Sequence, residues 1–142
     1  HRFVKPIMQG LTKLHTLLYK KFGGRFLGTF LGNPICMITA VGRRSGNLRT
    51  IPLLTIPYED DYILVASSGG SPLHPGWYYN LVNNPRIEMT VNSKTFTANA
   101  KKLSEDEKES VWPYIIKACP FYEEYRQKTT RNIPVFICYA IS

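Results

Sequence analysis

Acidic residues are absent from the first 58 positions of this 142-residue chain, and Glu59 is the first of only ten. Cysteine is scarce too, since the chain has only Cys36, Cys119 and Cys138. These three form neither a CxxC pair nor a CxxC–His spacing. The odd number of cysteines excludes a fully paired disulfide framework and favours free thiols in a reducing compartment. These spacings also argue against a zinc or haem-attachment site, so no metal is expected.

Long hydrophobic runs are also missing. The longest uncharged stretch, residues 26–41, has about 16 residues and is interrupted by glycine and proline, whereas a spanning helix needs roughly 20. No compact apolar segment is followed by a small-residue cleavage site, so we predict a cytoplasmic protein. The first residue is His1 rather than Met, and we expect the natural chain to begin earlier.

The 18 Lys and Arg give a formal net charge of +8, and nine of them fall within residues 1–50. This asymmetry indicates an anionic partner, which could be a phosphate-bearing cofactor, a membrane surface or nucleic acid. Nucleic acid is disfavoured, because basic residues do not alternate with aromatic ones along a predicted strand. Hydrophobic residues make up 44% of the chain and no linker or repeat divides it, which favours one globular domain.

The periodicity predicts a mainly β protein with peripheral helices. An amphipathic helix is expected over residues 7–22, followed by strands over 35–41, 48–57, 62–66, 86–91, 95–102 and 134–141. Short helices are expected over 77–82 and 121–129, and a capping box at Ser104 begins a helix that ends at Cys119-Pro120. Hairpin links without long crossovers favour a small antiparallel barrel over residues 25–142, preceded by an N-terminal helical segment over 1–24.

The first candidate site is the segment of residues 42–47, Gly-Arg-Arg-Ser-Gly-Asn, here called the basic loop. Its glycines let backbone N–H groups converge, while Arg43, Arg44 and Ser45 add donors that suit a phosphate. Arg49, at the start of the next strand, can point back toward the same place. The P-loop spacing is absent, and a solvated hairpin loop is the alternative.

Three further segments carry candidate chemistry. Residues 66–72, here called the serine loop, combine three serines with two glycines and can approach a flat ligand, or can be an ordinary turn. His74 is close to aromatic residues in the sequence and could be a general acid, although a packed or surface histidine is the favoured interpretation. Tyr122 and Tyr125 are three positions apart on one predicted helix face, where they suit a planar substrate or a half-buried core.

Taken in order, these motifs resemble the deazaflavin-dependent nitroreductase family, whose members use coenzyme F420. The resemblance spans roughly residues 25–139. It rests on the basic loop with Arg49, Pro52 and Leu53, the serine loop, Pro75, Trp77-Tyr78-Tyr79-Asn80, Asn84-Pro85, Trp112-Pro113, Pro120, Tyr122, Tyr125, Thr129, Arg131 and Ile133-Pro134-Val135. It implies a split β-barrel like that of flavin-mononucleotide-binding proteins.

The resemblance also implies roles for individual residues. The cofactor would be bound by Arg43, Arg44, Ser45, Arg49, Pro52, Ser67, Ser68, Gly69, Gly70, Pro75, Trp77 and Asn80. Ser67 and Tyr125 would act at the reacting atoms. The substrate would meet Leu54, Cys119, Tyr122 and Tyr125. Three of these positions depart from the family pattern, which has a lysine at Ser68 and tyrosines at Leu54 and Cys119.

The resulting hypothesis is an oxidoreductase that transfers a hydride from reduced coenzyme F420 to a quinone, an activated alkene or a nitro-aromatic acceptor. An enzyme that uses FMN and a non-catalytic flavin or deazaflavin binder are the alternatives. The lysine-bearing helix over 7–22 could rest on an anionic membrane on the cytoplasmic side, or pack on the barrel. Monomer and dimer are both left open.

Overall fold

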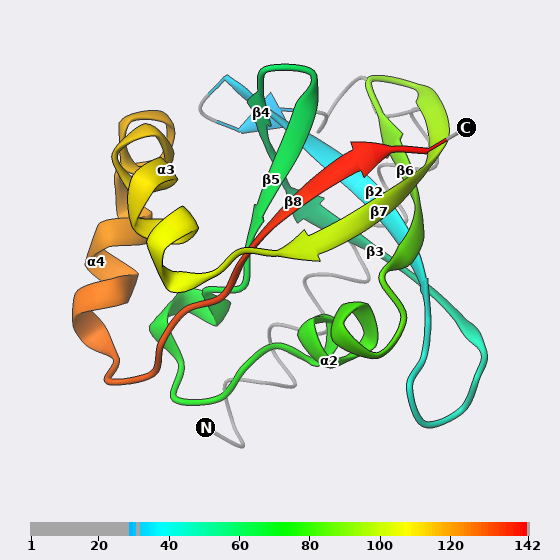
Figure 1. Cartoon of the computed structure of the whole chain (residues 1–142), viewed down its shortest axis with the longest axis horizontal. Coiled ribbons are helices and arrows are strands. Elements are labelled where there is room, and N and C mark those ends of the chain that lie inside the picture. Colours follow the sequence, from blue (N-terminus) through cyan, green and yellow to red (C-terminus); the bar gives the residue numbers. More distant parts are fainter. Residues whose placement is uncertain (1–28, 31, 142) are drawn as a thin grey trace.

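The computed structural model describes residues 29–30 and 32–141, so the helix predicted over 7–22 lies outside the described residues. Figure 1 shows a strongly curled sheet with α2 below it and α3 and α4 together at one side. The strands are β1 (Thr29–Phe30), β2 (Asn33–Val41), β3 (Leu48–Leu54), β4 (Ile56–Tyr58), β5 (Asp61–Val65), β6 (Arg86–Val91), β7 (Lys94–Lys102) and β8 (Val135–Ala140). The helices are η1 (Ser68–Gly70), α2 (Gly76–Asn83), α3 (Glu105–Ala118) and α4 (Phe121–Lys128).

Within the described ranges the sheet is antiparallel and follows the order β1-β2-β6-β7-β8-β5-β4, with β3 paired to β2. The edge strands β3 and β4 are consecutive in the chain and are joined by Thr55 alone. The Thr55 N–H donates to the Pro34 carbonyl (2.9 Å) at the start of β2, and its hydroxyl donates to the Ile63 carbonyl (3.1 Å) in β5. One fully buried residue therefore connects the two edges of the barrel.

The predicted strand over 48–57 is wrong in one respect, because the chain changes partner strand at Thr55. β3 pairs with β2 up to Leu54, and β4 then pairs with β5 from Ile56 onward. The hydrophobic pattern continues across this junction because Thr55 and Ile56 are both buried, so the pattern gave no sign of the break. Pro52 and Pro57 lie in the edge strands β3 and β4, where a missing ladder donor is tolerated.

Hairpins join β2 to β3, β4 to β5 and β6 to β7. In the third, Val91 pairs with Lys94, and the two residues between them, Asn92 and Ser93, have φ of 51° and 69°. Two positive φ values are what a tight two-residue turn requires if it is to match the twist of its strands. The hairpin link predicted between the strands over 86–91 and 95–102 is therefore confirmed.

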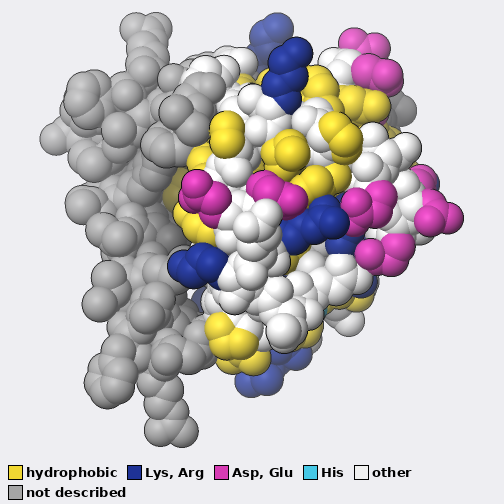
Figure 2. All heavy atoms as spheres, turned by 90° about the vertical axis from the view of Figure 1, so that its left-hand side faces the viewer, with side chains coloured by type: hydrophobic (Ala, Val, Ile, Leu, Met, Phe, Trp, Pro, Cys, Tyr) yellow, Lys and Arg dark blue, Asp and Glu magenta, His cyan; other side chains and the backbone are white. Residues whose placement is uncertain are grey.

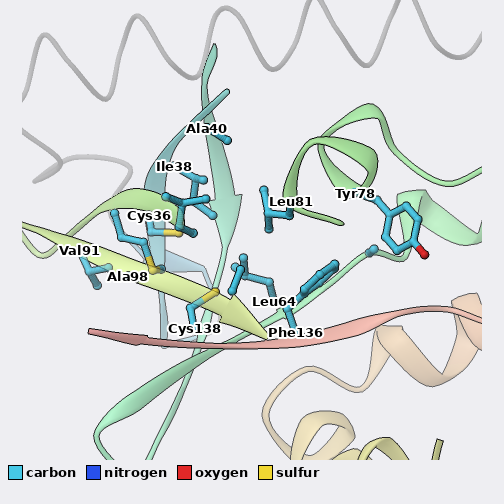
Figure 3. Close-up of a cluster of buried hydrophobic side chains, with 14 residues drawn as sticks. Cys36, Ile38, Ala40, Leu64, Tyr78, Leu81, Val91, Ala98, Phe136 and Cys138 are labelled. Atoms are coloured by element: carbon cyan, nitrogen blue, oxygen red, sulfur yellow. The ribbon is translucent and has the colours of Figure 1, made fainter. Parts of the chain in front are cut away.

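The core has two parts. The first fills the barrel and receives Leu81 and Tyr78 from α2, which Figure 3 shows beside Leu64 and Phe136 of the sheet. The second lies between the sheet and the α3–α4 pair and includes Trp112, Ile115, Cys119 and Tyr122. These two clusters fix α2 at one side of the barrel and α3 with α4 at another.

Ser104 caps α3 as predicted. Its hydroxyl accepts from the Glu107 N–H (3.2 Å), and a Glu107 carboxylate oxygen accepts from the Ser104 N–H (2.9 Å). Figure 2, which faces the α3 and α4 side, shows acidic and basic side chains mixed with hydrophobic ones. No helix in the described part of the chain is long and apolar enough to span a membrane.

Candidate active site

A groove of about 500 Å³ opens between the β2–β3 hairpin and α2. Its apolar lining comes from Ile38 and Ala40 of β2, Ile51 of β3, and Trp77 and Leu81 of α2. The lining at the hairpin end comes from Gly42, Arg43, Arg44, Ser45 and Arg49, with Asn80 of α2 beside them. One end of the groove thus suits a flat apolar group, and the other suits an anion.

The basic loop is held by its own backbone. The Gly42 N–H donates to the Asn47 carbonyl (2.7 Å), the Gly46 N–H donates to the Gly42 carbonyl (2.8 Å), and Ser45 Oγ accepts from the Asn47 N–H (3.1 Å). A Cβ on Gly42 would lie 2.9 Å from Ser45 Oγ and 3.4 Å from Arg49 Nε. Arg49 therefore folds back over the loop, as the sequence suggested, and Gly42 makes room for it.

Arg43 is positioned by two residues of α2. Its backbone N–H donates to Asn80 Oδ1 (3.0 Å), and its guanidinium lies over the Tyr79 ring, 4.6 Å from the centroid. Arg43, Arg44 and Arg49 are all exposed, and none forms an ion pair with a carboxylate in the described ranges. Stacking on an aromatic ring leaves the edge of a guanidinium available for an anion.

The serine loop follows β5 and has an unusual backbone. Ser68, Gly69 and Gly70 have consecutive φ values of 46°, 63° and 80°. A Cβ on Gly70 would lie 3.0 Å from the Tyr125 carbonyl and 3.2 Å from Lys128 Cβ, so the absence of a side chain here permits close packing against α4. The glycine at position 70 is therefore explained by packing against α4. Ser67, at the start of the loop, is buried.

The predicted substrate residues lie at the second core cluster. Cys119 is fully buried and its Sγ accepts from Asn33 Nδ2 (3.4 Å), while Tyr122 is 5% exposed. Burial raises the pKa of both groups, so the thiol and the phenol stay protonated. Leu54 packs against the same cluster, and only Tyr125 among the predicted tyrosines is half-exposed.

The structure thus separates the predicted site into two groups. Arg43, Arg44, Ser45, Arg49, Trp77 and Asn80 line one groove. Ser68, Gly69 and Gly70 form η1, which meets α4 beyond that lining, with Gly70 against Tyr125, and Ser67 directly precedes η1. Pro75 caps α2 ahead of Gly76, and buried Pro52 pairs with Met37 in the sheet, so neither lines the groove.

Two residues outside the predicted set contact these segments. Tyr79 stacks on Arg43, and Arg131 donates to the serine loop. Arg131 was among the motif residues, but nothing in its immediate neighbourhood indicated a partner 64 positions away. Tyr79 could have been noticed from its neighbour Asn80, since the two are consecutive residues of the same short helix.

The comparisons with known proteins agree with this geometry. The model of the F420H(2)-dependent quinone reductase family matches residues 11–140. The chain belongs to this family. An F420H(2)-dependent quinone reductase of Mycobacterium tuberculosis is 32% identical over 131 residues, which cover 89% of this chain and 88% of that protein.

Two solved structures are also similar to this chain. One, described as an F420-H2 dependent reductase (FDR-A), is 39% identical with a TM-score of 0.68, and the match covers 75% of this chain and 94% of that one. The other, described as a domain-swapped dimer, is 36% identical with a TM-score of 0.69, over 87% and 98% of the two chains. The split-barrel fold predicted from the motifs is confirmed.

The family assignment settles the class of chemistry. The chain is an oxidoreductase whose cofactor is coenzyme F420, and hydride transfer from F420H2 to a quinone fits both the family and the groove. The predictions of function, enzyme class and cofactor made from the motifs are confirmed at this level.

Proposed function

We propose that this quinone reductase family member binds the anionic part of coenzyme F420 with Arg43, Arg44 and Arg49, and places the ring system toward the serine loop. The observation that carries the proposal is the division of one groove into a basic end and an apolar end. A ligand that joins a flat ring to an acidic chain matches both ends. The three arginines lack carboxylate partners in the part of the chain described, so their charge is available to such a ligand.

The donor set also fits the cofactor chemically. Guanidinium groups bind phosphate and carboxylate in a bidentate manner, and the Ser45 hydroxyl can add a donor while its oxygen accepts from Asn47. Trp77 presents an aromatic surface, supported by packing against Phe136 with ring centroids 5.9 Å apart. F420H2, when bound, supplies the hydride.

The chain's own residues supply position and electrostatics. Ser67 and Tyr125 are proposed to donate hydrogen bonds to the acceptor oxygen, on which negative charge develops as a quinone takes the hydride. The Gly70–Tyr125 packing brings the serine loop and α4 together and supports this pairing. Cys119 and Tyr122 are proposed to shape the apolar surroundings from within the core.

Fluorescence titration with F420 and, separately, with FMN tests the cofactor site. Selective micromolar or tighter F420 binding supports the proposal, and the affinity should weaken with added salt because the contact is between charges. Arg49→Gln should weaken F420 binding about tenfold or more, as expected for the loss of one charge-assisted contact. Arg86→Gln, the same charge change on exposed β6 outside the groove, is the matched control.

Oxidation of F420H2 with a panel of acceptors tests the reaction. A short-chain naphthoquinone is the expected acceptor, and an activated alkene and a nitro-aromatic compound complete the panel. Ser67→Ala and Tyr125→Phe should lower turnover while F420 affinity changes little. Preference for FMN would indicate a flavin enzyme, and F420 binding without turnover would indicate a binding protein.

We also propose that the protein is cytoplasmic and contacts the membrane peripherally. Leu73 ahead of α2 and Val82 within α2 are each 53% exposed, and Leu48 beside the basic loop is 72% exposed. Exposed apolar side chains beside arginines suit an anionic lipid surface, from which a lipid quinone could be reached. Sedimentation with anionic but not neutral vesicles would support this, and equal recovery in the supernatant would contradict it.

The oligomeric state is a separate proposal. The similar structure described as a domain-swapped dimer supports dimer formation by this chain as well. Light scattering on a sizing column distinguishes the masses of monomer and dimer directly. A single monomer peak across the accessible concentration range would contradict the proposal.

A further inference from the structure

Arg131 lies between α4 and β8, and its guanidinium is surrounded by carbonyl groups of the serine loop. Nη1 donates to the Ala66 carbonyl (3.0 Å), Nη2 to the Ser67 carbonyl (2.6 Å) and Nε to the Ser71 carbonyl (2.9 Å). Two of the acceptors stand at the beginning of the loop and the third stands near its end. One planar group thus connects the two ends of the loop.

The backbone of the serine loop needs such a support. Ser68 has φ of 46°, a left-handed conformation that costs an ordinary residue about 1 kcal/mol or more. Within the loop, the Gly70 N–H donates to the Ser67 carbonyl (2.9 Å) and the Ser71 N–H donates to the Ser68 carbonyl (3.0 Å). The turn these bonds form directs carbonyls toward Arg131, where a cation compensates their converging dipoles.

Arg131 also reaches the lead into α2. Nη1 lies 2.7 Å from His74 Nδ1, and since arginine only donates, His74 accepts through Nδ1 and carries its proton on Nε2. The His74 ring packs against the Tyr78 ring with centroids 4.3 Å apart, and Tyr78 is buried in the barrel core. The same guanidinium therefore ties the serine loop to the helix that forms one wall of the groove.

Arg131 forms no ion pair with a carboxylate in the described residues. In the structure as described, the ion pairs involve Lys101, Lys108 and Arg126, and none includes Arg131. If Arg131 served only as one half of an ion pair, a single carboxylate partner would be enough. Four contacts at fixed directions instead require the planar fork of arginine, which lysine cannot reproduce.

We propose that Arg131 is a positioning residue for hydride transfer, holding the serine loop and the His74 end of α2 in the arrangement that the reaction requires. The inference rests on the proposed function for its catalytic consequence, because that function places Ser67 beside the reacting atoms. Arg131 itself need not touch cofactor or substrate. Its effect should therefore fall on the rate of hydride transfer and spare the affinity for F420, which the basic loop determines.

The test compares Arg131→Lys and Arg131→Gln with Arg126→Gln, a control on α4 that removes the same charge outside the site. Hydrogen exchange of the ligand-free chain is measured first, over peptides covering residues 66–74. Exchange there should rise in both Arg131 variants and remain unchanged in the control. The proposal would be overturned if residues 66–74 of Arg131→Lys exchanged at the wild-type rate. It would also be overturned if the exchange rate rose evenly over the whole chain.

The second measurement is single-turnover oxidation of F420H2 by a short-chain naphthoquinone. Both Arg131 variants should lose about tenfold or more in rate, the range for hydrogen bonds from a charged group, with the F420 Kd within about threefold of wild type. Millimolar guanidinium should restore part of the rate in Arg131→Ala. An unchanged rate in Arg131→Lys would overturn the proposal, whereas no oxidation by the wild type would refute the proposed function and leave the exchange result decisive for Arg131.

Discussion

The backbone N–H of Arg43 donates to Oδ1 of Asn80 at 3.0 Å and joins two segments 37 positions apart. This bond attaches the basic loop to the wall of the groove and fixes the spacing between them. The chain accordingly presents its arginines at one end of an apolar groove rather than on a loose hairpin.

Asn80→Ala should therefore weaken F420 binding without unfolding the protein. The basic loop loses an acceptor for its backbone N–H, and the predicted loss is about three- to tenfold in affinity, as expected for one hydrogen bond. Fluorescence titration measures it. Asn83→Ala, at an exposed position of the same helix outside the groove lining, should leave the affinity unchanged. Equal affinities in both variants would show that Asn80 does not organise the loop.

Gly42→Ala tests the loop from within. The new Cβ would lie 2.9 Å from Ser45 Oγ and 3.2 Å from the Asn47 carbonyl, so the loop must shift where Arg49 folds back. F420 affinity should fall by about tenfold, comparable to the loss of one charge-assisted contact. The melting temperature should change little, because residues 43–47 of the loop are exposed and can shift without disturbing the core. An unaltered titration curve would mean that the loop geometry is irrelevant to binding.

Thr55→Val tests the junction between the barrel edges. Valine preserves the shape but removes the donor to the Ile63 carbonyl, leaving a buried acceptor without this partner. We expect a loss of about 1–2 kcal/mol in the free energy of unfolding. Urea denaturation measures the loss, and Thr55→Ser, which keeps the hydroxyl, shows how much of it belongs to the hydrogen bond. A Val variant as stable as wild type would contradict the role of this bond.

His74 should make stability depend on pH. Burial lowers its pKa below the ordinary value of 6.5, and the nearby charges of Arg131 and Lys102 lower it further. The folded state then binds the proton more weakly than the unfolded state, so this contribution is fully present above pH 6.5 and is lost as pH falls toward the lowered pKa. Protonation of Nδ1 would also place an N–H against the Arg131 donor.

The comparison of wild type with His74→Gln isolates that contribution, because all other histidines are unchanged. Melting temperatures between pH 7.5 and 5 should fall more steeply in the wild type than in the variant. Parallel curves would refute the assignment of a lowered pKa to His74. The lowered pKa of Glu105, caused first by its hydrogen bond with Asn132, acts at more acidic pH and is common to both proteins.

Local chemistry allowed much of the fold to be predicted. The capping box at Ser104 depends on residues three apart, and the turn at Asn92-Ser93 depends on two residues that accept positive φ, so both were legible in the sequence. The break at Thr55 was not, because both sides of the junction are buried and the apolar pattern runs through it. Only pairing with two different strands defines it.

The candidate site divides along the same line. The basic residues concentrated in the N-terminal part without an acid, and the arginines bracketed by glycine, already indicated an anionic partner. The burial of Cys119 and Tyr122 could not be predicted in this way, nor could the contacts of Arg131 with Ser67 and His74, at separations of 64 and 57 positions. Burial and such long-range contacts depend on how the helices pack against the barrel, which no local pattern encodes.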